Sequence, residues 1–368
     1  MPIYMDRHDV PETVTAEILA QLHQEDLKIE KIFGCQGMTY WFDDQRKTAF
    51  CLIKAPNKQA IQEMHNHAHG DVPNSVIEVD ETLVEAFLGR ISDPAKTNDG
   101  SLKIIDDDAF RVIMVLETSN YLNRVEANQF SIFTQKFHNS VSKTIAQFEG
   151  RIVKQNNNKY LVSFKSVTNA ILCALKIQAN FKYITPKFDV QNRILKIGID
   201  AGSPVTHKKE LFEETITLAT QMCEIVNHDI VISSEIKSLY ENENRNAFID
   251  KERIYTLSPD EQKFLTDLMN YIETHWKQTE INVVDFAKAL GFSKSQLYRK
   301  LTALTGKSPN TFIRDYRLNQ SLKLLHEQRG NISEIAYLTG FSSLAYFSKC
   351  FKDKFNILPS TYIQQHVY

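Results

Sequence analysis

The feature that most constrains this sequence is a stretch that occurs twice near the C-terminus. The fragments FAKALGFSKSQLYRK (residues 286–300) and IAYLTGFSSLAYFSK (residues 335–349) align with an offset of 49 residues at the glycine and 50 after it. In each copy, apolar residues at helical spacing precede a glycine that can end a helix, and a serine follows that can cap the next one. We expect Ser293 and Ser342 to be these caps. Each copy therefore predicts a helix, a tight turn and a second helix.

The second helix of each copy is predicted to be amphipathic. Its buried stripe is formed by leucines in the first copy and phenylalanines in the second: Leu297, Leu301 and Leu304, then Phe347, Phe351 and Phe355. The polar residues at the start and on the opposite face are donors suited to phosphates and base edges: Ser293, Lys294, Ser295, Gln296, Arg299 and Lys300, then Ser342, Ser343, Tyr346, Lys349 and Lys352. Two copies are too few for a stacked repeat, which favours a paired helix-turn-helix over a structural helical hairpin. We expect the polar residues to bind DNA.

The segment between the copies fits this interpretation. SPNTFIRDYRLNQSLKLLHEQ opens with Ser308 as a cap and Pro309 at the first helical position, and as a helix it would be about 31 Å long. That length is close to the roughly 34 Å between successive major-groove faces of B-DNA. From residue 281 onward twelve Lys or Arg stand against five Asp or Glu, although the whole chain has a net charge of −2. A basic segment on an acidic body indicates a polyanionic partner.

The two copies, the helix between them and LPSTY at residues 358–362 resemble the DNA-binding domain of the AraC/XylS family of bacterial transcription regulators. The resemblance covers about the last 105 residues of the chain. It implies double-stranded DNA as the partner, with RNA polymerase beside it. Three positions depart from the family pattern: Asn356 replaces the usual glycine, Leu358 replaces Ser or Thr, and Ile363 replaces an arginine. We expect DNA binding to survive these departures, because asparagine tolerates the left-handed conformation that the glycine adopts.

Residues 109–258 alternate predicted strands and helices, as in an α/β sandwich. FRVIMVLE is followed by a helix over 126–148, the hairpin GRIVKQNNNKYLVSF, a helix over 167–183, LKIGIDAGSPV, a helix over 213–226 and the strand DIVISSEI. These landmarks resemble, in order, the class III adenylate/guanylate cyclase domain. The resemblance implies two metal-binding carboxylates and an arginine that stabilises the transition state.

The aligned positions depart from that requirement. Glu117 stands at the first carboxylate position and Asn158 at the second, Thr217 stands where the family has a ribose-orienting asparagine, and Gln221 replaces the arginine. A neutral amide cannot replace a metal-binding carboxylate or a cation. We therefore predict no cyclase activity, and leave open nucleotide binding and a role in a homodimer. The alternative is an active class III nucleotide cyclase fused to a DNA-binding module.

Residues 1–90 indicate a ferredoxin-like domain with an unusual number of histidines. The order is a strand, PIYMDRHDV, a helix over 14–33, the strands MTYWFDD and TAFCLIKA, a helix over 58–69 and the strand SVIEVD. His65 and His69 share one helix face, where two imidazoles can hold a transition metal. Two further pairs share a face in the same way: His23 with Asp26, and His8 with Asp6. Surface histidines without a metal are the alternative.

MDRHDV, YWFDD, TAFCLIKAP and MHNHAHG together resemble a small bacterial family of ferredoxin-like nickel-binding proteins. The resemblance covers about 80 residues. It implies nickel or another divalent transition metal as a cofactor, because imidazole with thiolate or carboxylate suits Ni²⁺, Cu²⁺ and Zn²⁺. We expect the ligands to be His65, His69, His8 and Cys51.

The 368 residues are therefore predicted to form a multidomain α+β plus all-α chain. It comprises a ferredoxin-like metal-binding domain (1–90), a linker (91–108), a degenerate cyclase-like domain (109–258) and a double helix-turn-helix (259–368). The absence of a long apolar run and of a signal peptide predicts a cytoplasmic protein without a membrane segment. Five scattered cysteines indicate reduced thiols. The leading interpretation is a DNA-binding transcription regulator whose upstream domains sense a metal or a nucleotide, or form a homodimer; a small-molecule enzyme in the first domain is a third alternative.

Overall fold

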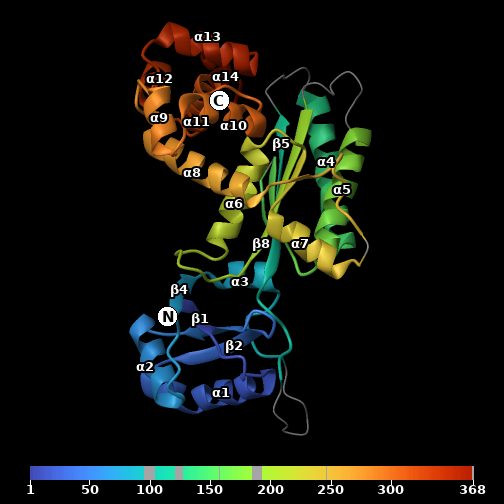
Figure 1. The fold of residues 1–368 in the computed structure, drawn as a ribbon, viewed down its shortest axis with the longest axis vertical. Coiled ribbons are helices and arrows are strands. Elements are labelled where there is room, and N and C mark those ends of the chain that lie inside the picture. Colours follow the sequence, from blue (N-terminus) through green and yellow to red (C-terminus); the bar gives the residue numbers. More distant parts are fainter. Residues whose placement is uncertain (95–103, 121–126, 157, 185–192, 246, 367–368) are drawn as a thin grey trace.

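The computed structural model describes residues 1–94, 104–120, 127–156, 158–184, 193–245 and 247–366. Figure 1 shows a small sheet with two helices at one end, a larger sheet in the middle and a group of helices at the other end. This arrangement confirms the predicted multidomain fold, with a ferredoxin-like part, an α/β sandwich and an all-helical C-terminal part.

The N-terminal sheet is antiparallel, with the strand order β2-β3-β1-β4. Its helices α1 and α2 cover one face. Side chains along β1 alternate between the two faces, so Tyr4 packs beneath the helices and Met5 packs on the opposite face. The elements are β1 (Ile3–Asp9), α1 (Ala16–Ile29), η1 (Glu30–Phe33), β2 (Gln36–Asp43), β3 (Thr48–Lys54), α2 (Lys58–Ala68) and β4 (Ser75–Val79).

The middle sheet has the order β10-β9-β8-β5-β7-β6 and carries helices on both faces. Helices α4, α5 and α7 share one buried core with the sheet, and α6 packs on the other face. The elements are β5 (Arg111–Asn120), α4 (Ala127–Gln147), β6 (Arg151–Gln155), β7 (Lys159–Phe164), α5 (Val167–Ile184), β8 (Arg193–Gly202), α6 (Glu213–Ile225), β9 (Ile230–Ile232), α7 (Ser234–Glu243) and β10 (Tyr255–Thr256). The expected strand DIVISSEI is too long, because Ser233 caps α7 and ends it.

The C-terminal part contains the two predicted helix-turn-helix units. Gly291 and Gly340 have φ values of 75° and 80°, as the tight turns require. Ser293 caps α10 as expected. The expectation for Ser342 is wrong by one residue: Ser343 caps α13, because the insertion that lengthens the second copy lies before the cap. The elements are α8 (Pro259–His275), α9 (Val283–Ala289), α10 (Lys294–Thr305), α11 (Pro309–His326), α12 (Ile332–Leu338), α13 (Leu344–Phe355) and α14 (Pro359–His366).

Helix α11, between the two units, is shorter than predicted. It has 18 residues and ends at His326, which gives a length of about 27 Å rather than about 31 Å. The amphipathic stripes of α10 and α13 are buried as predicted.

Two apolar cores join the three parts of the chain. The first combines Met5 and Phe50 of the N-terminal sheet with Phe87 of α3 (Glu81–Leu88) and with Phe212, the residue that precedes α6. The second combines the C-terminal half of α6 with the core of α8 to α11. Helix α3 lies where no helix was predicted. Residues 95–103 of the expected linker lie outside the described residues.

Candidate nucleic-acid interface and metal centre

The first predicted recognition helix, α10, exposes much of its polar face. Lys294, Ser295 and Arg299 are exposed, whereas Leu297 is fully buried. Sequence reasoning missed Tyr298, which is 53% exposed on the same helix. Its position directly after a buried leucine was a usable signal, because an aromatic residue off the buried stripe must face outward. An aromatic ring beside cations suits contact with nucleic acid.

Three other predicted DNA-binding residues of α10 have partners within the protein. Ser293 and Gln296 form a capping box: the Gln296 N–H donates to Ser293 Oγ at 3.2 Å, and the Ser293 N–H donates to Gln296 Oε1 at 2.9 Å. Lys300 is half-buried, with Nζ 5.8 Å and 5.3 Å from the ring centroids of Phe264 and Phe292. These contacts fix the start of the helix and place its polar face.

The second predicted recognition helix, α13, is exposed in the same way. Ser342, Tyr346, Lys349 and Lys352 are exposed. Ser343 is half-buried, and its Oγ accepts a hydrogen bond from the Tyr346 N–H at 3.4 Å. Neither recognition helix has its polar face packed inside the molecule.

A hollow of about 390 Å³ lies between the two helix-turn-helix units. Arg314 and Arg317 of α11 line it, together with Ser342 and Tyr346 at the start of α13. The Arg317 Nε–H donates to the carbonyl oxygen of Trp276 at 2.8 Å, which ties α11 to the end of α8. The hollow therefore brings two guanidinium groups and the start of α13 onto one concave surface.

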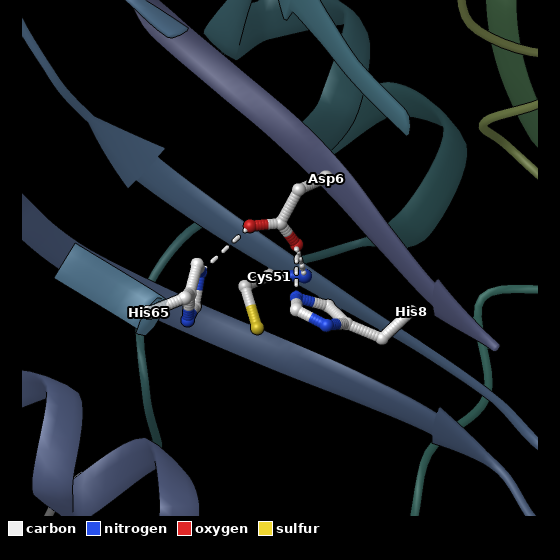
Figure 2. A group of neighbouring side chains, drawn as sticks. All are labelled: Asp6, His8, Cys51 and His65. Atoms are coloured by element: carbon white, nitrogen blue, oxygen red, sulfur yellow. Dashed lines mark hydrogen bonds and ion pairs between the residues drawn. The ribbon is translucent and has the colours of Figure 1, made fainter. Parts of the chain in front are cut away.

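A buried group of four metal-ligating side chains lies beneath α1 and α2 (Figure 2). This inner group consists of Asp6 and His8 from β1, Cys51 from β3 and His65 from α2. Asp6 Oδ1 accepts the Cys51 N–H at 2.9 Å, and Asp6 Oδ2 lies 3.0 Å from His65 Nε2. One ligand atom from each residue lies within 4.8 Å of the others. Alternation along β1 explains the arrangement, because Asp6 and His8 face the same side of the strand.

A second group, the outer group, shares His65 with the first. It consists of Asp26 from α1 with His65 and His69 from α2. His65 Nδ1 lies 3.3 Å from His69 Nε2, and Asp26 Oδ1 lies 3.2 Å and 3.3 Å from these two nitrogens. The structure thus divides the four predicted ligands, because His69 belongs to a different group from His8 and Cys51. Sequence reasoning paired Asp26 with His23, whose Nε2 instead lies 3.0 Å from Asp93 Oδ2.

Charge within the inner group shifts the pKa of each member. Burial by itself lowers the pKa of His8 and of His65, but the neighbouring aspartates outweigh burial and raise these values to about 9 and about 10. Burial favours a protonated Asp6, yet His8 and His65 hold its pKa below the usual range. Burial, followed by the charges of Asp6 and Asp26, raises the pKa of Cys51 far above its usual value. Protons therefore balance the charge of the metal-free cluster.

The donor set fits a divalent transition metal. Imidazole, thiolate and carboxylate together are ligands for such ions. Among the described residues, His8 Nε2 and Asp26 Oδ1 are buried polar atoms that make no hydrogen bond, although charged neighbours lie within ion-pair distance of both. Buried polar atoms normally have partners, and a bound cation would supply one. His67 lies outside both groups, with its ring beside that of Phe33.

The cyclase-like positions lie on the α6 side of the middle sheet, and a lysine occupies their surroundings. Glu117 Oε1 accepts a hydrogen bond from Asn158 Nδ2 at 3.3 Å, and its other oxygen lies 3.8 Å from Lys159 Nζ. The same ammonium lies 2.8 Å from Glu224 Oε1. Burial and the Glu224 charge raise the pKa of Glu117. An intramolecular cation therefore lies beside Glu117, the residue that was predicted for the first carboxylate position.

The remaining two positions differ in exposure. Thr217 is exposed on α6, whereas Gln221 is buried and its Oε1 makes no hydrogen bond within the described part of the chain. Neither side chain carries charge, so neither can neutralise a developing phosphate charge.

Among the helices that the structure describes, none combines the length and the apolar composition that a membrane span requires.

Two family models match the chain. The model of a helix-turn-helix domain matches residues 286–365. The model described as nickel responsive protein SCO4226-like matches residues 4–79.

Curated relatives match about a quarter to a third of the chain. Histidine kinase P4 of Formosa agariphila is 36% identical over 133 residues, which are 34% of this chain and 10% of the kinase. The uncharacterized regulator YdeC of Bacillus subtilis is 33% identical over 98 residues, 27% of this chain and 33% of YdeC. The probable transcription factor PqrA of Proteus vulgaris is 31% identical over 102 residues, 27% of this chain and 84% of PqrA. The chain thus spans a tenth and a third of the first two relatives.

Solved structures each match between about a fifth and two fifths of the chain. An AraC-type transcriptional regulator from Chromobacterium violaceum has 28% identity and a TM-score of 0.28, covering 30% of this chain and 96% of that one. SCO4226 from Streptomyces coelicolor has 32% identity and a TM-score of 0.20, covering 21% of this chain and 94% of that one. An adenylate/guanylate cyclase/hydrolase from Silicibacter pomeroyi has 20% identity and a TM-score of 0.31, covering 38% and 83%.

Proposed function

Because the chain belongs to the AraC-type helix-turn-helix family of transcription regulators, we propose that it controls transcription by binding a bipartite DNA site under the influence of a metal ion. The observation that carries the proposal is the pair of matched helices, α10 and α13, whose polar faces are exposed. In this proposal α10 and α13 enter neighbouring major grooves, and the N-terminal domain is the metal sensor.

Base reading is assigned to the exposed donors on the two helices. On α10 these are Lys294, Ser295 and Arg299; on α13 the cations are Lys349 and Lys352. Arginine reads guanine through two hydrogen bonds, whereas lysine is a point charge that suits phosphates. Ser293 and Gln296 act by holding the start of α10, and Lys300 by anchoring it on two aromatic rings.

Metal sensing is assigned to the inner group, with Asp6, His8, Cys51 and His65 as ligands. When bound, the ion would supply a divalent charge that neutralises Asp6 and a deprotonated Cys51. The match of residues 4–79 to the nickel-responsive model supports nickel as the first ion to test. Metal binding has to displace protons, because thiolate and neutral imidazole are the ligand forms.

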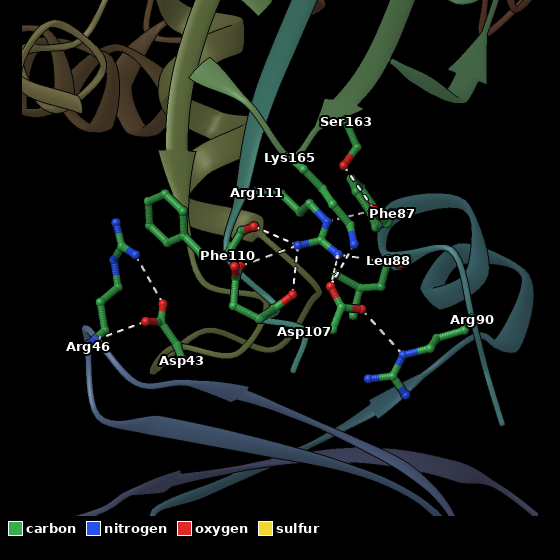
Figure 3. A network of polar contacts seen from close by, with 11 residues as sticks. Asp43, Arg46, Phe87, Leu88, Arg90, Asp107, Phe110, Arg111, Ser163 and Lys165 are labelled. Carbon is green, nitrogen blue, oxygen red and sulfur yellow. Dashed lines mark hydrogen bonds and ion pairs between the residues drawn. The ribbon is translucent and has the colours of Figure 1, made fainter. Parts of the chain in front are cut away.

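A buried joint supports transmission from the metal domain to the middle sheet (Figure 3). Arg111 is 1% exposed, and its guanidinium donates to the carbonyl oxygens of Phe87 and Leu88 at the end of α3. Asp107 Oδ1 lies 2.6 Å from Lys165 Nζ, and Asp107 Oδ2 lies 3.3 Å from Arg90 Nε. Such a joint, with an apolar core beside it, favours movement of the two sheets as one unit.

Helix α6 supports the next step, from the middle sheet to the DNA-binding part. Phe212 at its start belongs to the core shared with the N-terminal sheet, and Met222 and Val226 belong to the core shared with α8 to α11. The Asn227 N–H donates to the Leu304 carbonyl oxygen at 2.9 Å, at the C-terminal end of α10. A small displacement of α6 would therefore reach a recognition helix directly.

The cyclase-like part is proposed to be a structural relay rather than an enzyme. Glu117 is the only one of the aligned positions with a charge, and Lys159 accompanies it. Two metal ions on a triphosphate need two carboxylates, which Asn158 does not provide. Nucleotide binding without turnover stays a secondary proposal for this surface.

We further propose that the regulator acts in the cytoplasm as a homodimer in contact with RNA polymerase, which extends the family resemblance to partners. The division into residues 1–90, 91–108, 109–258 and 259–368 stays the proposed domain map. The joint at Arg111 and the two shared cores support mechanical coupling of the N-terminal, middle and C-terminal parts.

Fluorescence anisotropy with the full-length chain tests the proposal. Labelled duplexes from a bound-sequence pool are titrated with and without Ni²⁺, and with His65→Gln as the metal-site variant. We expect duplex binding, and a Ni²⁺-dependent change in affinity that His65→Gln removes. Binding that Ni²⁺ leaves unchanged would refute metal sensing but not DNA recognition, and an absence of duplex binding would refute both.

The rival cyclase function has its own test. The chain is incubated with ATP or GTP and Mn²⁺, and cyclic nucleotide is measured by chromatography. We expect none above a blank without protein. Cyclic product at enzyme-like rates would overturn the interpretation of Asn158, Thr217 and Gln221.

A further inference from the structure

His65 is the point where the inner and the outer groups meet. Its Nε2 lies 3.0 Å from Asp6 Oδ2, and its Nδ1 lies 3.2 Å from Asp26 Oδ1 and 3.3 Å from His69 Nε2. The side chain is 1% exposed, so both ring nitrogens are committed to protein atoms on opposite sides of the ring. Imidazole offers two separate ligand atoms, one at each nitrogen.

We propose that the chain binds two divalent transition-metal ions, one in each group, with the His65 ring bridging them. This inference rests on the metal-binding function proposed above, and adds a second ion and a shared ligand to it. The inner ion takes Asp6, His8, Cys51 and His65 Nε2. The outer ion takes Asp26, His69 and His65 Nδ1, and one position stays open for a water or an exchangeable ligand.

The spacing of the outer group is close to that of a preformed metal site. The three ligand atoms form a triangle with sides of 3.2, 3.3 and 3.3 Å. A tetrahedral ion with bonds of about 2.0–2.1 Å requires its ligand atoms to lie about 3.3–3.4 Å apart. Asp26 Oδ1, one corner of the triangle, is buried and makes no hydrogen bond within the described residues. An ion above the triangle would bind this oxygen directly, where now only the imidazole nitrogens of His65 and His69 lie within ion-pair distance.

Charge balance favours two ions over one. A single divalent ion in the inner group is neutralised by the Asp6 carboxylate and the Cys51 thiolate, and the Asp26 carboxylate, 7% exposed, then faces only the imidazoles of His65 and His69, which compensate its charge only when protonated. A buried charge without compensation is costly. With a second divalent ion, the two carboxylates, the thiolate and a deprotonated His65 ring balance all four positive charges. The protons released from Cys51 and His65 go to the solvent.

Each group contains residues that the other lacks, so mutations can remove one site and leave the other. Asp26→Asn and His69→Gln alter only the outer group, whereas His8→Gln and Cys51→Ser alter only the inner one. His67→Gln is a matched control, because His67 lies on the same helix and outside both groups. Each change keeps the side chain close to its original size, and circular dichroism verifies that each variant is folded.

The test measures metal stoichiometry on the full-length chain. Metal-free protein is loaded with Ni²⁺, dialysed, and analysed by inductively coupled plasma mass spectrometry. We expect two ions per chain in the wild type and in His67→Gln, and one in each single-site variant. A parallel sample is loaded with Cu²⁺ and examined by electron paramagnetic resonance. We expect magnetic coupling between the two ions in the wild type, and an uncoupled signal in Asp26→Asn.

The outcomes separate this inference from the proposed function. One ion per chain in the wild type would overturn the second site and leave metal binding intact. Two ions without magnetic coupling would overturn the bridge. No ion retained would overturn the metal-sensing function itself, and the inference with it. If His67→Gln lost as much bound metal as the single-site variants do, the ions would be adventitious surface ions, and the assignment would be overturned.

Discussion

At the scale of single residues, Asp200 on β8 is a buried carboxyl for which the described part of the chain provides no cationic partner. Its side chain faces the middle sheet's α6 side, since Leu195, Ile197 and Ile199 face the opposite core. Burial raises the pKa of Asp200 to about 6, with a hydrogen bond to Ser233 opposing the rise. The folded state therefore favours the protonated carboxyl more strongly than the unfolded chain does.

The sign of the effect follows from linkage. A carboxyl with a raised native pKa stabilises the fold below its unfolded value, and this contribution disappears as the pH rises through about 6. The neutral variant Asp200→Asn avoids that loss. We expect its advantage over the wild type to grow by up to about 3 kcal/mol between about pH 4 and about pH 7.

Urea unfolding followed by circular dichroism at several pH values measures this difference. Asp44→Asn changes an exposed carboxyl in the N-terminal part and serves as the control. Its difference from the wild type in the free energy of unfolding should stay nearly constant across this pH range. A constant difference between Asp200→Asn and the wild type across this pH range would contradict the assignment.

The metal-binding residues illustrate what sequence can reveal at this scale. Helical spacing identified His65 with His69, and strand alternation identified His8 with Asp6. Helix and strand periodicity could not place Cys51 or Asp26 beside His65, because these residues come from β3 and α1 and meet α2 across the core. Cys51 was expected as a ligand only from the family resemblance. The division into two groups is a property of packing, which no local pattern encodes.

At the scale of elements, Arg111 holds the end of α3. Its guanidinium donates to the carbonyl oxygens of Phe87, Leu88 and Phe110, and lies beside Asp108. The last carbonyls of a helix have no partner within the helix, so a buried cation there satisfies hydrogen bonds and opposes the helix dipole.

Arg111→Met keeps the volume and removes the donors. We expect destabilisation of about 3–5 kcal/mol, because buried carbonyls and the nearby aspartates lose their partner. Limited proteolysis should cut the segment between α3 and β5 more rapidly. Arg253→Met, at an exposed arginine with one weak hydrogen bond, is the matched control. Equal stability of both variants would rule out a structural role for Arg111.

The recognition helices give a prediction about how binding energy is divided. Arg299→Ala should weaken binding to a selected site by about 1–3 kcal/mol and relax its sequence preference. Lys352→Ala should weaken binding to all duplexes alike and lower the salt dependence by about one charge.

Anisotropy titrations at several salt concentrations distinguish the two effects. Lys263→Ala, at an exposed lysine of α8 that pairs with Asp267, should match the wild type. A uniform loss from Arg299→Ala would argue against base reading by that residue.

Sequence patterns located most elements because the local signals agreed. Glycine turns, serine caps and apolar stripes together predicted both helix-turn-helix units, and the errors arose where a boundary depends on one residue, such as Ser343 in place of Ser342. Helix α3 was missed although its local signals are present, since the Asp80 side chain caps its start and Gly89, with a φ of 86°, follows its end. Its packing between the N-terminal sheet and Phe212 depends on tertiary contacts. The sequence of a short connecting helix does not indicate which distant segments it will pack against.

At the scale of the whole molecule, α6 connects the two shared cores. Phe212 precedes it with a φ of 54° and is fully buried. A bulky residue in this left-handed region is strained, and the surrounding core has to hold it in place. The helix is thus fixed at one end by the metal-side core and at the other by the core of the DNA-binding part.

Hydrogen exchange with mass spectrometry tests this connection. Addition of Ni²⁺ should change protection in α6 and around Asn227 and Leu304, as well as in the N-terminal sheet. In His65→Gln the distant changes should disappear. Changes confined to the N-terminal sheet would mean that the metal site and the DNA-binding part are independent.

The proposed function requires one chain to read two neighbouring grooves with α10 and α13. In vitro selection of bound duplexes by the full-length chain tests it most directly. We expect enriched sites with two conserved blocks whose centres lie about 10 base pairs apart. A single conserved block, or no enrichment over random sequence, would contradict it.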